Sequence, residues 1–248
     1  MHKNIYFLSD FHFIVDDAAS HEREKLVVLF LDSIRGDAKK IYILGDIFDF
    51  WFEYKTVIPK GFTRFYACLH RLLDAGVEIE IFTGNHDMWQ FGFFENEFNI
   101  KVHFDLIQVT HNNKVFLLGH GDGKGPGDMG YKVLKKMFNN TLCKKLFGII
   151  HPTIGNRLAY FWSKKSRLSQ VDKPHNTFMG LEHEWLYQYC QKRAATEVVH
   201  YYVFGHRHLP LHLPINQHSY YINLGDWITH NSYARWDGER MTVSSFSK

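Results

Sequence analysis

The sequence predicts an α/β fold, in which a parallel sheet is covered by helices, in a single domain spanning residues 1–248. Two observations lead to this prediction. Short apolar runs alternate along the chain with segments whose apolar residues recur at helical spacing. Several of the runs also end in glycine and a carboxylate, which is typical of strands that lead into the loops at the carboxyl edge of a sheet.

The first half of the chain contains this alternation. Three apolar runs are predicted strands, at 4–10 ("NIYFLSD"), 39–46 ("KKIYILGD") and 77–85 ("VEIEIFTGN"). Helices are predicted between them at 21–34 and 62–76, and Gly76 is expected to end the second helix. Residues 101–122 then predict a hairpin with the turn "HNN".

The middle of the chain, at about 123–195, has a different character. Apolar residues follow helical spacing at 127–150 and 175–194, and the basic stretch "SKKSRLSQVDK" separates the two segments. Strands are predicted again at 198–208 and 219–227. We therefore expect a helical insertion, or lid, over the mouth of one α/β domain.

Composition indicates a folded protein, with 45% hydrophobic and 22% charged residues. The net charge of +3 is too small to indicate a nucleic-acid partner by itself. The three cysteines are widely spaced and form no Cys-x-x-Cys pair, so we expect no thiolate zinc site. Their odd number and wide spacing fit a reducing compartment. We expect neither a signal peptide nor a membrane span, because no apolar run approaches ~18 residues.

Polar clusters rich in aspartate, asparagine and histidine follow five of the predicted strands. They are Ser9–His12, Gly45–Asp46, Gly84–Asp87, Gly119–Asp122 and Gly205–His208. Each cluster alone is more often a turn or a helix cap than a metal site. Five of them at the edge where α/β proteins bind ligands predict a site for Mn²⁺, Fe²⁺ or Zn²⁺, because these ions accept oxygen and imidazole ligands.

The ordered set Asp-x-His, Gly-Asp-x-x-Asp, Gly-Asn-His-Asp, Gly-His and Gly-His-x-His resembles that of the calcineurin-like metallophosphoesterases. This resemblance implies a β-sandwich flanked by helices (αββα) and two divalent metal ions, with manganese the first choice and zinc or iron the alternatives. The ligands that it implies are Asp10, His12 and His208 for one ion, Asn85, His120 and His206 for the second, and Asp46 as the bridge between them.

The resemblance also implies roles for residues beside the ligands. His86 is expected to act on the phosphate, by giving a proton or a hydrogen bond to the leaving oxygen, and Asp87 is expected to orient His86. Asp49 is expected to support a ligand from behind, with a turn carboxylate as the alternative. Asp122 is expected beside the active site, in contact with the substrate or with a ligand.

Within this superfamily, "GDIFDFWF", "HGDG", the insertion and "GHRHLP" are similar to the bacterial UDP-2,3-diacylglucosamine diphosphatases of lipid A biosynthesis. The resemblance implies hydrolysis of a pyrophosphate to 2,3-diacylglucosamine 1-phosphate and UMP. It also implies a peripheral position on the cytoplasmic face of the inner membrane, with no nucleic acid and no obligate protein partner. The best-known members have arginine where this chain has His86.

The predicted lid suits a substrate with two acyl chains. Its apolar side chains either cover those chains or simply pack the lid onto the sheet; they are Leu134, Met137, Phe138, Leu142, Leu146, Phe147, Ile149 and Ile150. Three basic residues, Lys164, Lys165 and Arg167, are candidates for contact with the substrate phosphate or with anionic lipid headgroups. A solvated basic loop is the alternative.

Two other functions remain open at this point. A nuclease or cyclic-nucleotide phosphodiesterase would share every metal ligand, although the amphipathic lid and the lack of a strong basic stripe argue against long nucleic acid. A non-catalytic scaffold of the same fold tends to lose ligands, whereas this sequence keeps the full set together with His86.

Overall fold

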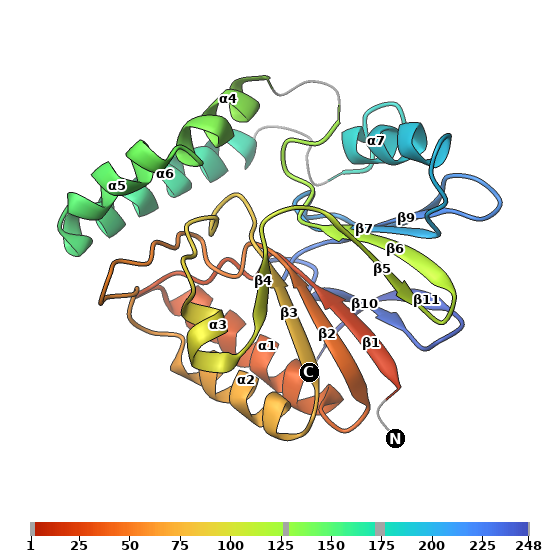
Figure 1. Cartoon of the computed structure of the whole chain (residues 1–248), viewed down its shortest axis with the longest axis horizontal. Helices are drawn as coiled ribbons and strands as arrows, with labels where there is room; N and C mark the ends of the chain where they lie inside the picture. The colour runs from red at the N-terminus through yellow and green to blue at the C-terminus, as the bar shows by residue number, and fades with distance from the viewer. Residues whose placement is uncertain (1–2, 126–128, 172–176, 248) are drawn as a thin grey trace.

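The computed structural model describes residues 3–125, 129–171 and 177–247, and for residues 129–131, 133–134 and 162–171 it describes the backbone alone. Two sheets face each other, and helices cover the outer face of each sheet (Figure 1). The expected αββα sandwich is therefore confirmed.

The first sheet has the strand order β11-β10-β1-β2-β3-β4. Its parallel strands are β1 (Asn4–Leu8), β2 (Ala38–Leu44), β3 (Glu78–Phe82) and β4 (Lys101–His103). β10 (Ser232–Trp236) and β11 (Met241–Ser245) extend it in antiparallel pairing. Three helices belong to this half: α1 (Ala18–Ile34), α2 (Thr63–Asp74) and the short α3 (Phe93–Phe98).

The second sheet has the order β5-β6-β7-β9-β8. Its strands are β5 (Ile107–His111), β6 (Lys114–Gly119), β7 (Tyr201–Phe204), β8 (Pro210–Pro214) and β9 (Tyr220–Leu224). The central strands β6, β7 and β9 are parallel, and the edge strands β5 and β8 pair with them antiparallel. Helix α7 (Trp185–Ala194) packs on its outer face through Leu186 and Cys190.

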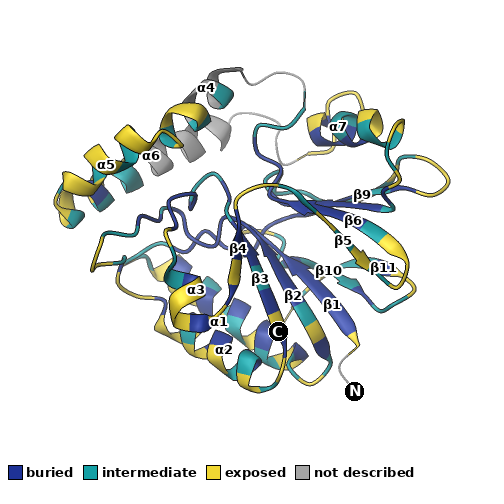
Figure 2. Cartoon of the chain, viewed as in Figure 1, coloured by how far each residue is buried: buried dark blue, intermediate teal, exposed yellow. Residues whose placement is uncertain are grey.

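Alternation of side chains along the strands builds the layers. On β1, Ile5 and Phe7 point into the layer between the sheets, whereas Tyr6 and Leu8 point towards α1 and α2. All four are buried, so the central strands are apolar on both faces. Burial on both faces makes the central strands a rigid support for the loops that follow them (Figure 2).

The segment 101–122 differs in part from the expected hairpin. β5 and β6 do form a hairpin, around Asn112 and Asn113. Their φ angles of 47° and 61° are positive, as the two central residues of a tight hairpin turn require. Residues 101–103, however, form β4 of the first sheet. The chain therefore passes from the first sheet to the second at 104–106. The alternation of apolar and polar residues cannot reveal this change, because residues 101–103 and β5 show the same alternation.

Helices α4 (Met129–Phe138), α5 (Thr141–Ile149), α6 (Pro152–Val171) and α7 occupy most of the expected insertion. The basic stretch expected to separate two helical segments is helical as far as Val171, so that expectation is wrong for residues 163–171. Residues 126–128 and 172–176 lie outside the described part. Among the described residues, no helix has the length and apolar character needed to cross a bilayer.

Candidate metal centre

The predicted ligands lie in loops that follow strands of both sheets. Asp10, Asp46 and Asn85 come after β1, β2 and β3, whereas His120 and His206 come after β6 and β7. The carboxyl ends of these parallel strands meet at one edge of the sandwich. Residues more than 190 positions apart in the sequence are thereby brought within hydrogen-bonding distance, as His12 and His208 are.

The backbone of these loops is strained. Five of the predicted ligands have a left-handed φ, at 58° for Asp10, 46° for His12, 53° for Asp46, 68° for His206 and 55° for His208. Non-glycine residues seldom adopt this conformation, and each instance costs on the order of 1–3 kcal/mol. The concentration of strain in the ligand loops is typical of a functional site.

The first predicted ligand group is compact. Asp10, His12 and His208 each offer a ligand atom within 4.8 Å of the others. The Nε2 atoms of His12 and His208 are 3.3 Å apart, and His208 Nε2 is 3.3 Å from Asp10 Oδ1. Asp10 Oδ1 is buried and accepts no hydrogen bond, so an acceptor in this group lacks a donor.

The second predicted group centres on Asn85. Its Oδ1 atom lies 3.0 Å from His120 Nε2 and 2.8 Å from His206 Nδ1. Asp46 lies between the two groups, because its Oδ2 atom is 3.2 Å from His120 Nε2 and 3.6 Å from His12 Nε2. This is the position that a bridging carboxylate requires.

Three of the histidines are oriented from behind. His12 Nδ1 faces Asp49 Oδ1 at 3.3 Å, His208 Nδ1 faces Asp226 Oδ2 at 3.2 Å, and His120 Nδ1 donates to the Leu44 carbonyl oxygen at 2.8 Å. With Nδ1 engaged in this way, each ring presents Nε2 to the cluster. Metal-ligating histidines characteristically show this arrangement, so the donor set fits a divalent metal.

Electrostatics indicate the same need for a cation. Burial by itself would lower the pKa of His12, but Asp10, Asp49 and Asp46 raise it to about 10. Burial likewise opposes charge on His120, and the carboxylate of Asp46 raises its pKa to about 10. The buried carboxylates thus attract positive charge, which divalent ions supply when they replace protons on the ligands.

Glycines next to the ligands leave the room that these contacts need. A Cβ atom on Gly84 would meet the carboxylate of Asp46, and one on Gly205 would meet Asp10 Oδ2 at 2.5 Å. Gly45 has a φ of 91°, and a Cβ atom there would lie 2.8 Å from His120 Nδ1. Substitution of these glycines would therefore displace ligands directly.

His86 lies at the edge of the cluster. Its ring is 4.8 Å from that of His12, and its Nδ1 donates to the Asp49 carbonyl oxygen at 2.9 Å. Its backbone N–H donates to Asp46 Oδ1 at 2.8 Å. Burial lowers the pKa of His86. The Asp46 carboxylate raises this pKa, but by less, so the pKa stays below its ordinary value.

Asp87 has different partners from those expected. Instead of orienting the His86 ring, its fully buried carboxylate accepts the backbone N–H groups of Gly84, Asp46 and Ile47 at 2.7, 3.3 and 2.8 Å. A carboxylate that can accept several bonds is a natural clamp for amides in two loops. Asp87 therefore joins the Asp46 loop to the Asn85 loop.

The remaining predicted residues fall into two sets. Asp122 is buried two residues after His120 and forms an ion pair with Lys135 of α4. Burial opposes its charge, but His120 and Lys135 together lower its pKa. Lys164, Lys165 and Arg167 lie on α6, and their side chains lie outside the described part of the structure.

Two functional contacts were not expected from the sequence. Asp226 supports His208 and also accepts the backbone N–H groups of residues 228–230. The Gly-Asp pair after β9 could have indicated it, since it repeats the pattern after β2. Arg207, between two predicted ligands, forms a two-point ion pair with buried Glu184 at 2.9 and 3.1 Å.

Aromatic residues connect the lid to the loop that carries His86. Trp89 Nε1 donates to the Phe138 carbonyl oxygen at 2.8 Å. The ring of Phe147 lies 4.8 Å from the rings of Trp89 and Phe52 and 5.8 Å from that of Phe50. Of the predicted apolar cover, Phe138 and Phe147 therefore pack onto the domain itself.

Comparison with known proteins gives close relatives. A UDP-2,3-diacylglucosamine hydrolase from Porphyromonas gingivalis is 38% identical over 261 residues, covering 99% of this chain and 98% of that protein. A protein of the same name from Neisseria meningitidis serogroup B is 28% identical, covering 96% of this chain and 95% of that protein. No protein-family model matches the chain.

A solved phosphoesterase from E. coli, YfcE, aligns with 98% of the chain and 92% of that protein at 16% identity, with a TM-score of 0.47. Such a distant likeness adds nothing about function. With 38% identity across 99% of its length to a relative of matching size, the chain belongs to the UDP-2,3-diacylglucosamine hydrolase family.

Proposed function

We propose that the chain hydrolyses the pyrophosphate of UDP-2,3-diacylglucosamine to 2,3-diacylglucosamine 1-phosphate and UMP, with the candidate metal centre as the active site. The observation that supports this most is the meeting of ligand-type side chains from both sheets, among them Asp10, His12, Asp46, His120 and His208, in a member of this family. Metal-dependent hydrolysis of a phosphoric anhydride needs such a cluster.

The ligand assignment forms part of the proposal. Asp10, His12 and His208 would hold one divalent ion, Asn85, His120 and His206 would hold the other, and Asp46 would contact both. When bound, two such ions lower the pKa of water, clamp the phosphate and neutralise developing charge. Manganese is the first choice because the ligands are oxygen and imidazole only, with zinc or iron as alternatives.

His86 would act on the phosphate itself. Donation from Nδ1 to the Asp49 carbonyl fixes the ring, and Nε2 is then the nitrogen that can meet the phosphate. Because the best-known family members have arginine at this position, the shared requirement is a group that stabilises negative charge on the reacting phosphate. A positioned group of this kind typically contributes 10²–10⁴-fold to the rate.

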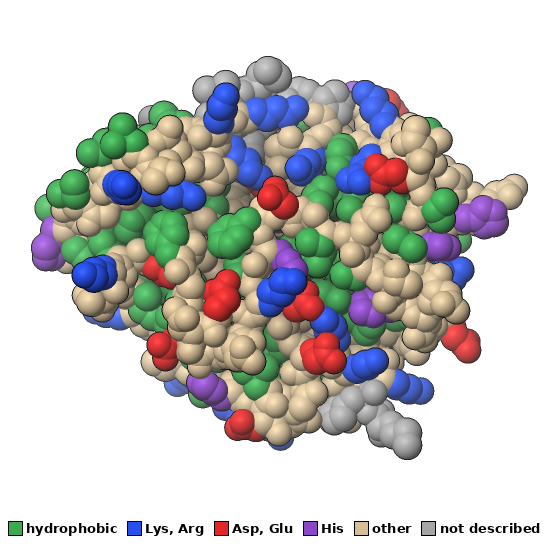
Figure 3. All heavy atoms as spheres, in the orientation of Figure 1, with side chains coloured by type: hydrophobic (Ala, Val, Ile, Leu, Met, Phe, Trp, Pro, Cys, Tyr) green, Lys and Arg blue, Asp and Glu red, His purple; other side chains and the backbone are tan. Residues whose placement is uncertain are grey.

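The lid would receive the acyl chains. Side chains of α5 and α6 that point away from the domain core form rows at helical spacing: Leu142, Leu146 and Ile149 on α5, and Ile154, Leu158 and Phe161 on α6. Hydrophobic side chains gather at this end of the molecule (Figure 3). We place the protein peripherally on the cytoplasmic face of the inner membrane, where such a surface and the substrate would meet.

The experiment that tests this function supplies the manganese-loaded protein with UDP-2,3-diacylglucosamine and, separately, with generic phosphodiesters. Release of UMP at a far higher kcat/KM than hydrolysis of bis(4-nitrophenyl) phosphate is the expected result. If the protein preferred the generic diester or a cyclic nucleotide, this proposal would be wrong and the protein would be a general phosphodiesterase. Absence of hydrolysis of every compound would favour a scaffold.

A further inference from the structure

His86 is held by two segments that have no regular secondary structure. Residues 83–92, which contain His86, lie between β3 and α3, and residues 45–62, which contain Asp49, lie between β2 and α2. Every residue of both segments is described, and neither segment contains a helix or a strand. The Asp49 carbonyl oxygen accepts the hydrogen bond that fixes the His86 ring. The position of this ring therefore depends on how the side chains of two irregular segments pack.

The two segments pack together through aromatic side chains. Phe52 and Trp89 form a single β-bridge, and the Glu53 N–H donates to the Trp89 carbonyl oxygen at 3.2 Å. The rings of Phe52 and Trp89 lie 5.3 Å apart, and both side chains are buried. Trp89 follows His86 by three residues, and Phe52 follows Asp49 by three residues. This aromatic pair is therefore close in sequence to both partners of the hydrogen bond that fixes the His86 ring.

The lid packs against the same aromatic pair. The Phe147 ring on α5 lies 4.8 Å from the rings of both Phe52 and Trp89. A Cβ atom on Gly155 of α6 would lie 3.2 Å from the Phe147 ring, so the second lid helix also approaches this ring closely. Packing of this density transmits the displacement of one side chain to its neighbours. A change at Phe147 is therefore expected to displace Trp89 and the segment that carries His86.

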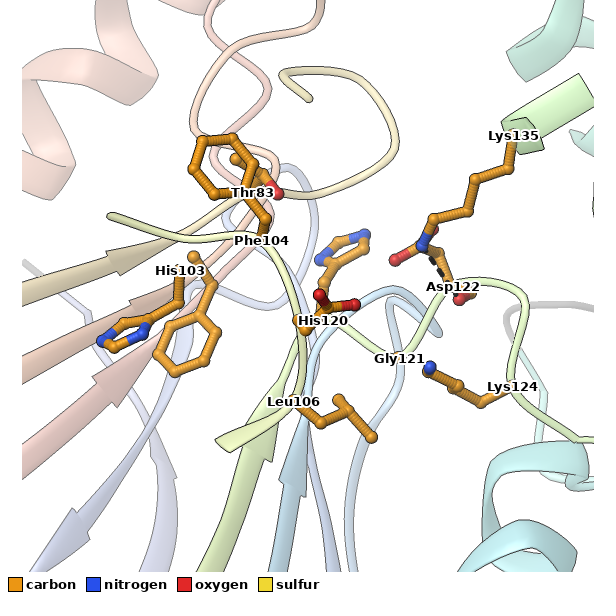
Figure 4. A pocket seen from close by; sticks show the side chains of 11 residues that line it. Thr83, His103, Phe104, Leu106, His120, Gly121, Asp122, Lys124 and Lys135 are labelled. Carbon is orange, nitrogen blue, oxygen red and sulfur yellow. Dashed lines mark hydrogen bonds and ion pairs between the residues drawn. The ribbon is translucent and has the colours of Figure 1, made fainter. Parts of the chain in front are cut away.

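Other contacts keep the lid attached when Phe147 changes. Lys135 of α4 forms an ion pair with Asp122, in the loop that follows β6 (Figure 4). The ring of Tyr160 on α6 lies 6.1 Å from that of Phe50. Truncation of Phe147 alone is therefore expected to loosen the aromatic contact without releasing the lid.

We infer that the lid positions His86 for the reaction, in addition to receiving acyl chains. Phe147 is a positioning residue, because it acts on the reaction through Trp89 and Phe52. The inference rests on the proposed function, in which His86 stabilises the reacting phosphate, and extends it to a lid residue outside the metal centre. Its consequence is that the lid affects the turnover of substrates that have no acyl chain.

The test is a double-mutant cycle on the manganese-loaded full-length protein with bis(4-nitrophenyl) phosphate, a diester without acyl chains. Phe147→Ala should lower kcat by about tenfold or more, because a 1 Å misplacement of a catalytic group can cost about 10²-fold. KM should change little, since the lost interaction is made mainly in the transition state. In the His86→Ala background the same substitution should have no further effect on kcat, because its effect passes through His86.

Two further variants complete the cycle. Phe147→Leu keeps an apolar side chain and should lose less kcat than Phe147→Ala, and again nothing in the His86→Ala background. It takes the place of Phe147→Ala if that variant does not fold. Phe178→Ala removes the same ring from a 43% exposed position in the insertion and should leave kcat unchanged. Equal losses of kcat in the wild-type and His86→Ala backgrounds, or no loss in either, would overturn the inference.

Hydrogen exchange measured by mass spectrometry gives a readout that does not depend on turnover. Phe147→Ala should speed the exchange of the backbone amides of residues 84–90, and Phe178→Ala should not. Unchanged exchange in Phe147→Ala would also overturn the inference. If wild type releases no UMP from the lipid nucleotide, the proposed function fails, but the cycle and the exchange measurement still decide whether the lid positions His86. If the lid has no effect while wild type releases UMP, the proposed function stands.

Discussion

Asp46 is the residue that connects the two halves of the site. Its backbone is held at a φ of 53°, its Oδ1 atom accepts the His86 N–H, and its Oδ2 atom faces both His12 and His120. Burial raises its pKa, but the charges of His120 and His86 outweigh burial and hold it well below its usual range. Asp46 is therefore ionised and placed to contact two cations at once.

The hydrogen bond from His86 to this carboxylate comes from the backbone N–H, so replacing the side chain with alanine keeps that bond. We expect His86→Ala to lose turnover by roughly 10²–10⁴-fold while metal content and Tm stay close to wild type. His86→Arg should recover part of the rate, since a guanidinium also stabilises phosphate charge. Kinetics combined with metal analysis checks this. Loss of metal or unfolding of His86→Ala would show that the ring is structural.

Asp87 should behave in the opposite way. In Asp87→Asn one acceptor oxygen becomes an NH₂ group that faces a backbone N–H, so a buried donor is left unpaired. We expect the free energy of unfolding to fall by roughly 1–3 kcal/mol, as measured by urea denaturation. Asp74→Asn, on an exposed residue at the end of α2, is the control. If Asp87→Asn kept the stability of wild type but lost turnover, Asp87 would act directly in catalysis.

Residue identities predicted the clustering of these side chains, because aspartate, asparagine and histidine after parallel strands meet at one edge of a sheet. The assignment of individual metal ligands comes from the family resemblance and stays a prediction. The partners of those residues could not be predicted in the same way. The contacts of Asp87 depend on two loops that approach only in the folded chain, and the Arg207–Glu184 pair joins residues 23 positions apart across the lid's end. Neither contact has a periodic pattern.

At the scale of elements, the loop between β7 and β8 is a strained part of the site. It carries His206 and His208 in left-handed conformations. Arg207 between them reaches Glu184, which is 1% exposed and precedes α7, and also the Thr177 carbonyl oxygen. The end of the insertion therefore holds two predicted ligands in place.

Breaking this link should affect metal binding. We expect Arg207→Ala to weaken metal affinity roughly tenfold or more, within the range seen when supporting residues around metal ligands are removed. Arg193→Ala breaks the ion pair between Arg193 of α7 and Glu197, which follows that helix, and should leave metal affinity unchanged. Equilibrium dialysis against the metal measures both variants. If Arg207→Ala bound the metal as tightly as wild type, the strained loop would hold its shape without Arg207.

The lid lends itself to a test with the substrate. If α5 and α6 cover acyl chains, shortening those chains should lower kcat/KM much more than changing the uracil, because each buried CH₂ is worth about 0.8 kcal/mol. A series of substrates with progressively shorter chains measures how steeply kcat/KM falls with each CH₂ removed. Equal rates on acylated and deacylated substrates would indicate a soluble nucleotide substrate and a purely structural lid.

The central elements could be predicted from the sequence, and several elements nearer the edges of the sheets could not. β1, β2, β3, α1 and α2 have continuous apolar patterns that are buried on the expected faces. β8 has no buried residue and β11 has one, so their apolar patterns are too weak to distinguish from loops. β10 alternates between buried and half-buried residues but includes the polar Ser232 and Arg235, which obscure the pattern in the sequence. β4 has only three residues, which hid it inside the expected hairpin.

At the scale of the whole molecule, the site exists only where the two sheets meet. The loops of the first sheet carry Asp10, His12, Asp46 and Asn85, whereas those of the second carry His120, His206 and His208. Each predicted ion therefore takes ligands from both sheets. Stacked aromatic residues such as Phe7 and Phe116 fill the apolar layer between the sheets, and this layer separates the two sets of loops that carry the ligands.

The measurement that tests the central claim most directly follows UMP release from UDP-2,3-diacylglucosamine by wild type and Asp46→Ala, with bound metal determined in the same samples. Wild type should release UMP in a metal-dependent way and bind two ions. Asp46→Ala should remain folded, bind less metal and release no measurable UMP. A folded Asp46→Ala protein that releases UMP at the wild-type rate would contradict the two-metal account.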